Sequence, residues 1–381
     1  LLPAETDSMQ AEILGSGSIS SIKNIAAGLN ARKILLVTGQ HSFTSSGAEA
    51  ALYRHLAQLD IERFSEFEVN PRLEDVGRGV NLLRSFRPDL VVAAGGGSVI
   101  DMGKLVTILS AQPSEDYTAI VEKSSITAKG VPLAAIPTTS GTGSEATHFA
   151  VVYIHGRKFS VAHRYMLPDF VIVDAELTYN TGPYQSAVSG MDALCQGVES
   201  YWSVHSTARS RYFGSKAIKS ILASLENSVL TGSKAARREM ALGAHYAGQA
   251  INITKTTAPH ALSYSLTSHY GIPHGHAVAL ILGGFFAINE ENREHSIDRR
   301  GSVYFGQIMD DLYTMFGCKN AAACSDCWYR LMESIGLKTE FASFGIKDAG
   351  DYALIIGGVN LERLNNHPVP LTRGRLAMLF A

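Results

Sequence analysis

Residues 89–98 have the sequence Asp89-Leu-Val-Val-Ala-Ala-Gly-Gly-Gly-Ser98, an apolar run that passes directly into three glycines and a serine. The apolar run is typical of a buried strand, and the glycines mark the turn from that strand into a helix. Glycine lets backbone N–H groups approach an anion, and the dipole of the following helix favours negative charge. We therefore expect Gly95, Gly96, Gly97 and Ser98 to bind a nucleotide phosphate. The alternative is a tight turn whose small residues serve packing alone.

Similar apolar runs recur on either side of this turn, and amphipathic segments separate them. The runs are residues 33–39, 131–136 and 170–173, and the segments between them include residues 46–59 and 73–86. Apolar runs without polar alternation, separated by helices, indicate βαβ units and a parallel sheet covered on both faces. The first half of the chain is therefore predicted to be a Rossmann-like α/β domain.

The pattern changes after residue 175, where helical periodicity replaces the short apolar runs. No strand-like alternation returns, and the helical segments are residues 191–204, 207–230, 235–251, 276–289 and 302–316. The change falls around Thr178-Tyr-Asn-Thr-Gly-Pro183, a sequence rich in turn residues. We predict two domains, an α/β nucleotide-binding domain over residues 1–178 and an all-α domain over residues 179–381.

The composition is that of an ordinary globular protein. The chain has 381 residues, 46% of them hydrophobic, and 33 basic against 35 acidic residues give a net charge of −2. This balance provides no electrostatic footprint for nucleic acid. The longest apolar stretch, residues 277–288, contains two glycines and is shorter than the roughly 18 residues that a membrane span needs. No signal-peptide pattern opens the sequence, so we expect a cytoplasmic protein with neither membrane nor nucleic acid as a partner.

Three of the four cysteines lie close together in the sequence, at Cys318, Cys324 and Cys327. The last two form a C-x-x-C pair, a spacing found in redox and zinc sites. No second pair accompanies them, and the surrounding sequence has helical periodicity. We expect reduced, structural cysteines.

A second polar loop follows the apolar run at residues 131–136. Its sequence is Pro137-Thr-Thr-Ser-Gly-Thr-Gly-Ser-Glu145, which is rich in hydroxyl side chains. Ligands of α/β proteins collect at the carboxyl ends of parallel strands, where this loop is expected to lie. We therefore expect Thr138, Thr139, Thr142 and Ser144 to contact phosphate, ribose or amide groups of a cofactor.

The end of the first apolar run bears on the choice of cofactor. In Rossmann-type sites an acidic residue at a strand end binds the ribose 2′-OH of NAD. Here the run ends in Val37-Thr-Gly-Gln-His41, which contains no carboxylate. We place Gly39 among the cofactor-binding residues, and the missing carboxylate permits NADP(H) while NAD(H) stays open.

The helical half contains residues with metal-ligand chemistry. Asp192 and Gln196 are one turn apart on a single helix, and His260 and His274 flank a short segment further along. A carboxylate and two imidazoles suit a divalent cation such as Fe²⁺ or Zn²⁺, and an amide oxygen is a weaker fourth ligand. The spacing alone is unspecific because the chain has 13 histidines, most of which are expected at the surface or in the core.

Five motifs follow one another in a characteristic order. They are Gly95-Gly-Gly-Ser-Val-Ile-Asp101, Thr138-Thr-Ser-Gly-Thr-Gly-Ser-Glu145, Leu167-Pro-Asp-Phe-Val-Ile-Val-Asp174, Gly190-Met-Asp-Ala-Leu194 and Pro273-His-Gly275. Together they resemble the iron-containing (group III) alcohol dehydrogenase family, over residues 12–375. The resemblance implies a dehydroquinate synthase-like fold, with an N-terminal nicotinamide-binding domain that includes Asp101 and a helical domain that holds a metal and the substrate.

The resemblance also implies roles for individual residues. Asp192, His260 and His274 match three of the four metal ligands of the family. The fourth is normally a histidine, and Gln196 takes its place here. A further family histidine is replaced by Tyr264. We expect the proton of an aldehyde reduction to come from Tyr264 or His269, directly or through water.

The Gln196 variant and the segments Glu199-Ser-Tyr-Trp-Ser-Val204 and Thr254-Lys-Thr-Thr-Ala-Pro-His-Ala-Leu-Ser-Tyr264 resemble one subgroup, the phosphonoacetaldehyde reductases (hydroxyethylphosphonate dehydrogenases). A phosphonate dianion needs fixed positive charge and hydrogen-bond donors. Lys255 is our first candidate for that charge, with Arg164 and Lys158 as further ones; the alternative is that all three are solvated surface residues. The expected partner is a small aldehyde, phosphonate-bearing in this subgroup, and a homodimer is a possible assembly.

Three rival functions accompany this hypothesis. The chain can be a generic short-chain alcohol dehydrogenase of the same family. It can be a cyclising lyase similar to dehydroquinate synthase, although the short Gly95–Asp101 and Thr138–Glu145 motifs favour the dehydrogenase. The replacement at Gln196 also makes a nucleotide-binding protein with a degenerate metal site conceivable.

Overall fold

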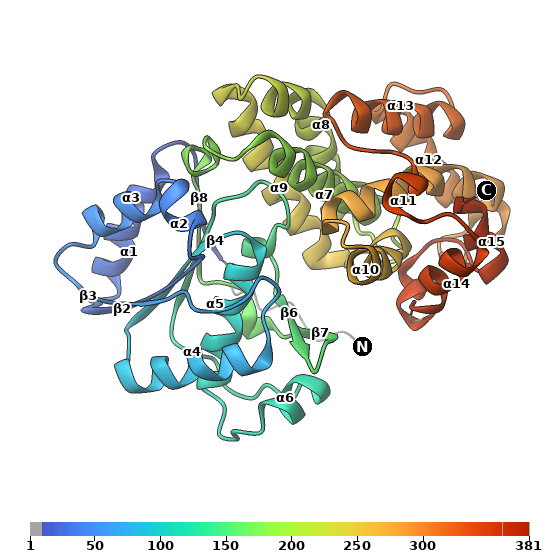
Figure 1. The fold of residues 1–381 in the computed structure, drawn as a ribbon. Coiled ribbons are helices and arrows are strands. Elements are labelled where there is room, and N and C mark those ends of the chain that lie inside the picture. Colours follow the sequence, from blue (N-terminus) through green and yellow to red (C-terminus); the bar gives the residue numbers. More distant parts are fainter. Residues whose placement is uncertain (1–9, 360, 381) are drawn as a thin grey trace. The chain divides into compact units, whose positions relative to one another are not determined.

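The computed structural model describes residues 10–359 and 361–380, which form two compact units (Figure 1). The first unit holds residues 10–139 and 144–180, and the second holds residues 140–143, 181–359 and 361–380. The segment Ser140–Gly143 thus packs with the second unit, although it lies within the predicted cofactor loop. The predicted fold class, an α/β half followed by a helical half, is confirmed.

A six-stranded sheet, in which every neighbouring pair is parallel, forms the centre of the first unit. Its strand order is β1-β8-β5-β4-β2-β3. The strands are β1 (Ala11–Leu14), β2 (Lys33–Thr38), β3 (Asp60–Phe64), β4 (Leu90–Gly95), β5 (Leu133–Pro137) and β8 (Phe170–Val173). The carboxyl ends of parallel strands share one edge of the sheet, so the predicted glycine turn after β4 lies beside the loops after β2 and β5.

Helices cover both faces of this sheet, as the unbroken apolar runs predict. Alternate residues of β2 and β4 belong to separate cores: Leu35 and Val91 pack with one cluster, and Leu36 and Val92 pack with the other. The first core includes α4 (Leu73–Phe86), α5 (Gly97–Ser110) and α6 (Tyr117–Lys123). The second includes α1 (Ile22–Gly28), α2 (Ser42–Ser45) and α3 (Ala48–His55).

The sequence pattern did not reveal β1, β3 or an antiparallel hairpin of β6 (Phe149–Ile154) and β7 (Arg157–Ala162). β1 and β3 are the two edge strands of the sheet. β3 carries three charged residues because an edge strand packs less completely than a central one. The hairpin stands outside the main sheet; β6 alternates in burial, and β7 is mostly exposed or half-buried, so neither strand forms a buried apolar run.

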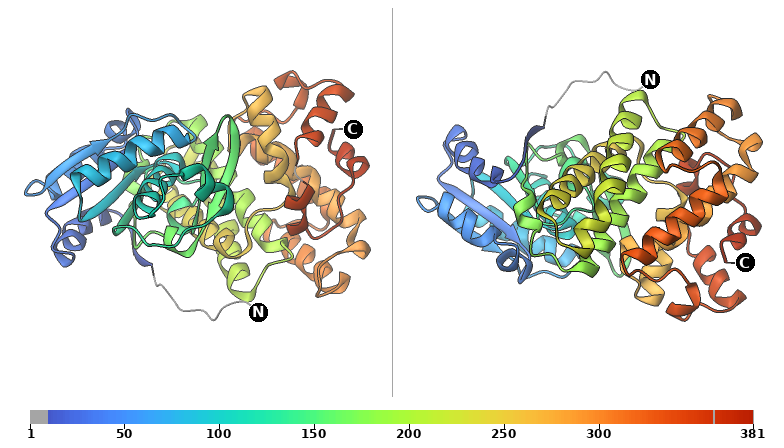
Figure 2. Two further views of the ribbon diagram at one scale, coloured as in Figure 1. Left: turned by 90° about the horizontal axis from the view of Figure 1, so that it is seen from below. Right: turned by 90° about the horizontal axis from the view of Figure 1, so that it is seen from above.

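The described part of the second unit is helical and contains no strand. Helices α7, α8 and α9 pack side by side (Figures 1 and 2). The helices are α7 (Pro183–Trp202), α8 (Ala208–Leu230), α9 (Lys234–Thr254), α10 (Ala258–Tyr270), α11 (His274–Glu291), α12 (Ser302–Met315), α13 (Ala321–Ser334), α14 (Ala349–Gly357) and α15 (Arg373–Ala377).

The most buried helices of this unit are α7 and α11. α7 is buried at every residue from Ser186 to Trp202, and α11 contains the longest apolar stretch of the chain. Helices that are apolar on all sides belong either in a core or in a membrane. Over residues 10–359 and 361–380, none of the helices combines the length and the hydropathy that a bilayer span requires.

The cysteines of the second unit are free thiols. Burial, together with the neighbouring Cys318, raises the pKa of the Cys324 and Cys327 thiols. A raised pKa keeps a thiol protonated and unreactive, which agrees with reduced, structural cysteines.

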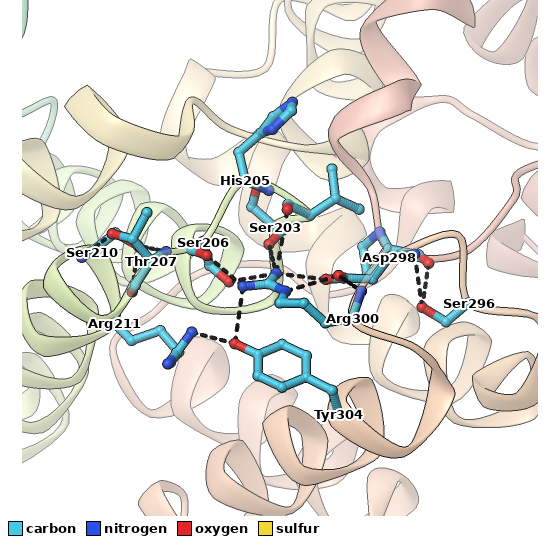
Figure 3. Close-up of polar contacts among 12 residues, drawn as sticks. Ser203, His205, Ser206, Thr207, Ser210, Arg211, Ser296, Asp298, Arg300 and Tyr304 are labelled. Atoms are coloured by element: carbon cyan, nitrogen blue, oxygen red, sulfur yellow. Dashed lines mark hydrogen bonds and ion pairs between the residues drawn. The ribbon is translucent and has the colours of Figure 1, made fainter. Parts of the chain in front are cut away.

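The C-terminal end of α7 is fixed by one arginine (Figure 3). Arg300 donates to the carbonyl oxygens of Ser203 (3.2 Å) and Val204 (3.3 Å), and a forked pair of contacts at 2.8 and 2.6 Å joins it to Asp298. Its guanidinium lies 4.2 Å from the centre of the Tyr304 ring. Arg300 thus holds in place the segment that directly follows α7, beginning at its C-cap Ser203.

Candidate active site

Three of the predicted metal ligands lie together in the second unit. Asp192 of α7, His260 of α10 and His274 of α11 each offer one ligand atom, and these atoms all lie within 4.8 Å of one another. Within the described residues, no other group of three or more histidine, cysteine or acidic side chains meets this condition. The structure therefore brings together residues that are 68 and 14 positions apart in the sequence.

A glycine makes this approach of helices possible. Gly275 follows His274 at the start of α11, and a Cβ atom at Gly275 would lie 2.2 Å from the carbonyl oxygen of Val188 and 2.9 Å from Cβ of Asp192. Real Cβ atoms do not come that close, so only glycine lets α11 contact α7 at this point. The Pro-His-Gly motif thus has a local structural reason: it places His274 beside Asp192.

Gln196 lies one turn after Asp192 on α7, and its side chain is buried. Its Oε1 atom and the Oδ1 atom of Asp192 are both buried and make no hydrogen bond of good geometry, although Oδ1 faces Nε2 of His260 at 3.3 Å. Buried oxygens without partners are unfavourable and rare, and a bound cation would satisfy them. The amide oxygen, the carboxylate and the two imidazoles fit a divalent cation, with the glutamine as a neutral ligand where the family has a histidine.

His260 is held between two carboxylates. Its Nε2 atom lies 3.3 Å from Oδ1 of Asp192, and its Nδ1 atom contacts Oε2 of Glu199. Burial disfavours the charged imidazole, but the neighbouring Glu199 and Asp192 outweigh it and raise the pKa of His260 to about 10. A divalent cation competes with that proton, so metal binding at this site is coupled to proton release.

Glu199 was not identified as a functional residue from the sequence. It is fully buried and accepts hydrogen bonds from the backbone N–H and the hydroxyl of Thr257, both at 2.9 Å, besides its contact with His260. The signal was present in the spacing: residues 192, 196 and 199 follow the i, i+4, i+7 pattern of one helix face. What the sequence does not show is that α10 packs against that face.

The two predicted proton donors occupy different environments. The ring of Tyr264 is stacked on the ring of His274, with centroids 5.8 Å apart and an angle of 12° between the planes. His269 is exposed in the last turn of α10, five residues further on. Five residues correspond to about 140° of rotation around a helix, so His269 points away from the Tyr264 side of α10. The structure brings Tyr264, and not His269, to the candidate ligands.

Lys255 has an unusual backbone. It ends α9 with φ 58° and ψ 179°, a conformation that glycine adopts readily and other residues adopt only under strain. Its side chain is exposed. The loop around it is tied down, because the Asn366 amide donates to the carbonyl oxygens of Thr254 and Thr256, at 3.3 and 3.2 Å. The strain is thus maintained by the surrounding structure.

The predicted phosphate-binding turn joins β4 to α5 in the first unit. β4 ends at Gly95, Gly96 is the N-cap, and no side chain caps the N-terminus of α5. A Cβ atom at Gly96 would lie 3.5 Å from Oγ1 of Thr139, so Thr139 lies beside the turn, and Thr138 donates its backbone N–H to the carbonyl oxygen of Gly95 at 3.0 Å. Open backbone N–H groups at a helix N-terminus are suited to an anion such as a pyrophosphate.

Asp101 and Ser144 contact each other at the side of this turn. Asp101 accepts from the Ser144 hydroxyl at 2.5 Å and from the backbone N–H of Val151 at 2.9 Å. The buried Lys104, one turn after Asp101, surrounds its ammonium group with oxygens of Ser144, Thr147 and Phe149 at 2.5 to 3.1 Å. These contacts fasten the Thr138–Ser144 loop to α5. A direct contact of Asp101 or Ser144 with the cofactor stays a prediction.

The remaining predicted cofactor residues lie in two further loops. Gly39 directly follows β2, and a Cβ atom there would lie 2.3 Å from Oγ of Ser42. Ser98 accepts from the backbone N–H of Asn70 at 3.2 Å. Thr142 is exposed and belongs to the Ser140–Gly143 segment that packs with the second unit, where Gly143 lies against Gly248 of α9.

Comparison with known proteins identifies the family. The model "Iron-containing alcohol dehydrogenase" matches residues 10–175, and the model "Fe-containing alcohol dehydrogenase family, C-terminal" matches residues 186–380. Together these matches extend over both units, which is more than half of the chain.

Individual relatives are similar in sequence over most of the chain. Long-chain-alcohol dehydrogenase 1 of Geobacillus thermodenitrificans is 29% identical over 373 residues, which are 96% of this chain and 93% of that protein. Phosphonoacetaldehyde reductase of Streptomyces viridochromogenes is 31% identical over 314 residues, which are 78% of this chain and 77% of that protein.

A similar solved structure is sulfoacetaldehyde reductase from Bifidobacterium kashiwanohense in complex with NAD⁺. It is 28% identical, with a TM-score of 0.87 over 99% of this chain and 98% of that one. The family matches favour a dehydrogenase over a lyase or a nucleotide-binding protein without activity. The chain belongs to the iron-containing alcohol dehydrogenase family and is an NAD(P)-dependent alcohol dehydrogenase, or aldehyde reductase, of that family.

Proposed function

We propose that this enzyme reduces a short aldehyde with a tetrahedral anionic head group, phosphonoacetaldehyde, to 2-hydroxyethylphosphonate. The proposal joins three elements: the nucleotide-type loops of the first unit, the candidate ligand cluster of the second unit, and a cationic residue close in sequence to that cluster. Similarity to a phosphonoacetaldehyde reductase supports the choice of substrate.

The observation that carries the proposal is the strained backbone of Lys255. A non-glycine residue in this conformation costs about 1 to 3 kcal/mol, and such strain concentrates at functional sites. Lys255 lies five residues before His260, and Thr257 of the same loop is hydrogen-bonded to Glu199, which contacts His260. An exposed ammonium group in such a loop is suited to bind a phosphonate by charge-assisted hydrogen bonds.

The residues of the cluster would divide the chemistry as follows. Asp192, Gln196, His260 and His274 would hold a divalent cation, Fe²⁺ or Zn²⁺. A bound cation supplies Lewis acidity to the carbonyl oxygen, and a bound reduced nicotinamide supplies a hydride to the carbonyl carbon. Tyr264 holds a proton at its phenol oxygen beside His274, from where it can pass to the alcohol oxygen that forms. Lys255 orients the substrate by its anionic end.

The test compares aldehydes with and without the anion. Wild type and Lys255→Gly are assayed with phosphonoacetaldehyde and with propanal, by the absorbance of the reduced cofactor. We expect kcat/KM of the variant to fall roughly 10- to 100-fold on phosphonoacetaldehyde and to stay unchanged on propanal, because a hydrogen bond to a charged group contributes about 1.5 to 3 kcal/mol. The variant should also melt at a higher temperature, because glycine relieves the strain.

Arg87→Gly is the matched control, since Arg87 also has a positive φ, 55°, but lies at the end of α4 in the first unit. Equal kcat/KM of the wild type on the two aldehydes would reduce the proposal to a generic alcohol dehydrogenase. An equal loss on both aldehydes in Lys255→Gly would assign Lys255 to the fold and not to the substrate.

Sulfoacetaldehyde is the second candidate substrate, because the solved structure described above is a sulfoacetaldehyde reductase. Its sulfonate carries one negative charge where a phosphonate carries up to two, and both are tetrahedral anions that a lysine can bind. Adding sulfoacetaldehyde to the same assay decides between them by the ratio of the two kcat/KM values.

A further inference from the structure

The two candidate imidazole ligands face different groups at their Nδ1 atoms. Nδ1 of His260 contacts the carboxylate of Glu199, whereas Nδ1 of His274 lies 3.4 Å from the hydroxyl oxygen of Ser263. An imidazole binds a metal ion through one ring nitrogen, and the hydrogen bond made by the other nitrogen decides which of the two is available. Ser263 is therefore placed to decide how His274 meets a cation.

Ser263 is fully buried on α10, three residues after His260 and directly before Tyr264. Its hydroxyl donates to the backbone carbonyl oxygen of His260 at 2.8 Å. A serine hydroxyl has one proton to donate and lone pairs that accept. Because the carbonyl oxygen is the nearer partner and can only accept, the Ser263 proton points to it, and a lone pair of Oγ remains for His274.

The direction of the second contact follows from the first. A lone pair of Oγ accepts, so Nδ1 of His274 carries the proton that lies between the two residues. A neutral imidazole has a single N–H, and Nε2 therefore keeps the lone pair that a cation binds. The opposite tautomer would require the Ser263 proton to leave a 2.8 Å hydrogen bond for a 3.4 Å contact.

Ring packing restrains His274 in a different way. Its ring is stacked on Tyr264, with 12° between the planes, and lies at 70° to the ring of His260, with centroids 5.4 Å apart. These contacts restrain the plane of the His274 ring but do not distinguish one ring nitrogen from the other. The contact with Ser263 does, and it also joins the backbone of one candidate ligand to the ring of the next.

We propose that Ser263 is a positioning residue of the candidate metal centre: its hydroxyl oxygen accepts from Nδ1–H of His274 and makes Nε2 the nitrogen that binds the cation. Ser263 thus does for His274, with a neutral hydroxyl, what Glu199 does for His260 with a carboxylate. This proposal rests on the metal centre in the proposed function and adds the residue that orients one of its ligands.

The tautomer of His274 tests the proposal without any metal or aldehyde. Metal-free wild type labelled with ¹⁵N-histidine is studied by NMR correlations between the ring nitrogens and the ring protons. The signals of His274 are those that are missing from His274→Ala. We expect a protonated Nδ1 and an unprotonated Nε2. A protonated Nε2 in the wild type would overturn the proposal.

Co²⁺ titration of the metal-free protein measures the consequence for binding. In Ser263→Ala the Kd for Co²⁺ should rise roughly 10- to 100-fold, because a ligand that loses its outer hydrogen bond is no longer held in one orientation. Ser200→Ala is the matched control. Ser200 on α7 is also fully buried, and its hydroxyl also donates at 2.8 Å to the carbonyl oxygen three residues earlier, that of Gly197. Both variants should lower the melting temperature, and only Ser263→Ala should weaken Co²⁺ binding.

The outcomes separate this proposal from the proposed function. Equal Co²⁺ affinity in the wild type and Ser263→Ala, or an equal loss in Ser200→Ala, would overturn the role of Ser263 and leave the ligand cluster intact. If Ser263→Ala does not fold, the tautomer of the wild type decides. A wild type that binds no Co²⁺ would overturn the ligand cluster together with the role of Ser263, whereas the choice of aldehyde is tested independently by the substrate comparison.

Discussion

A buried polar cluster of the first unit differs from one of the second unit in how many of its atoms have hydrogen-bond partners. In the first unit, the Lys104 ammonium group is surrounded by five oxygens, and Asp101 accepts two hydrogen bonds. In the second unit, the buried Oδ1 atom of Asp192 and Oε1 atom of Gln196 make no hydrogen bond of good geometry, although Oδ1 faces Nε2 of His260 at 3.3 Å.

This difference separates a structural cluster from a binding cluster. A satisfied buried network such as the one around Lys104 stabilises the fold, because its polar atoms already have partners. Unsatisfied buried oxygens are unfavourable in the fold and gain free energy when a cation arrives. The comparison predicts that perturbing the first cluster changes mainly the free energy of unfolding, and that perturbing the second changes mainly metal binding and catalysis.

The largest expected effect is the loss of catalysis on removing a candidate ligand. His274→Ala should lose its metal, as measured by elemental analysis of the purified protein, and aldehyde reduction should fall at least about 1000-fold. NADPH binding should survive, because the predicted cofactor loops do not include this residue. His295→Ala, at an exposed histidine of the same unit, serves as the control. Wild-type turnover in His274→Ala would remove the cluster from the mechanism.

The structural cluster is tested by Lys104→Met. Loss of the ammonium group leaves the Asp101 carboxylate and several carbonyl oxygens without their positive partner, so the free energy of unfolding should decrease by about 3 to 5 kcal/mol. Urea denaturation measures this change against Lys123→Met, at an exposed lysine of the same unit. Metal content per folded molecule should stay at the wild-type level. A variant as stable as the wild type would mean that the cluster contributes little to the fold.

Glu199 links the two kinds of cluster, because it is satisfied and also contacts a candidate ligand. Its contact with Nδ1 of His260 fixes the ring so that Nε2 points toward Asp192, where a cation would bind, an arrangement common in metal sites. Glu199→Gln presents an amide N–H to that ring, so metal affinity should fall roughly 10- to 100-fold, measured by Co²⁺ titration of metal-free protein.

Two control variants accompany Glu199→Gln. Thr257→Val removes the 2.9 Å hydroxyl bond to Glu199 and keeps the His260 contact, so it should lower the melting temperature without changing metal affinity. Glu290→Gln, which alters the carboxylate bonded to Tyr313, should leave metal affinity unchanged. Unchanged Co²⁺ affinity in Glu199→Gln would assign Glu199 to the fold alone.

Contiguous features of this protein were predictable from its sequence, and features made by tertiary contacts were not. The turn at Gly95–Ser98 is one local motif, so its strand and helix could be inferred before the structure was known. Asp192, His260 and His274 were named through the order of motifs, because spacing alone does not show that three helices converge. Lys104 and Glu199 escaped notice, since they contact residues 40 and 61 positions away through packing that no local pattern encodes.

The smallest expected effect concerns His367, which tests whether a single unsatisfied buried atom is enough to mark a binding site. Its ring is fully buried, Nε2 contacts Oδ1 of Asn289 at 2.8 Å, and Nδ1 is unpartnered, yet it belongs to no ligand cluster of the described residues. Burial lowers the pKa of His367 to about 3. The unfolded chain, with an ordinary histidine pKa near 6.5, therefore binds a proton that the folded chain does not bind between pH 6.5 and 3. The free energy of unfolding should fall across this window, by about 2 kcal/mol from pH 7 to pH 5.

Urea denaturation at the two pH values should show a smaller difference in the free energy of unfolding for His367→Gln than for the wild type. An equal difference would mean that His367 is protonated in the folded state as readily as in the unfolded one. The unpartnered nitrogen of His367 lies alone among the Trp202 and Phe285 rings. A metal site therefore requires several unsatisfied atoms that converge, and one such atom is not enough.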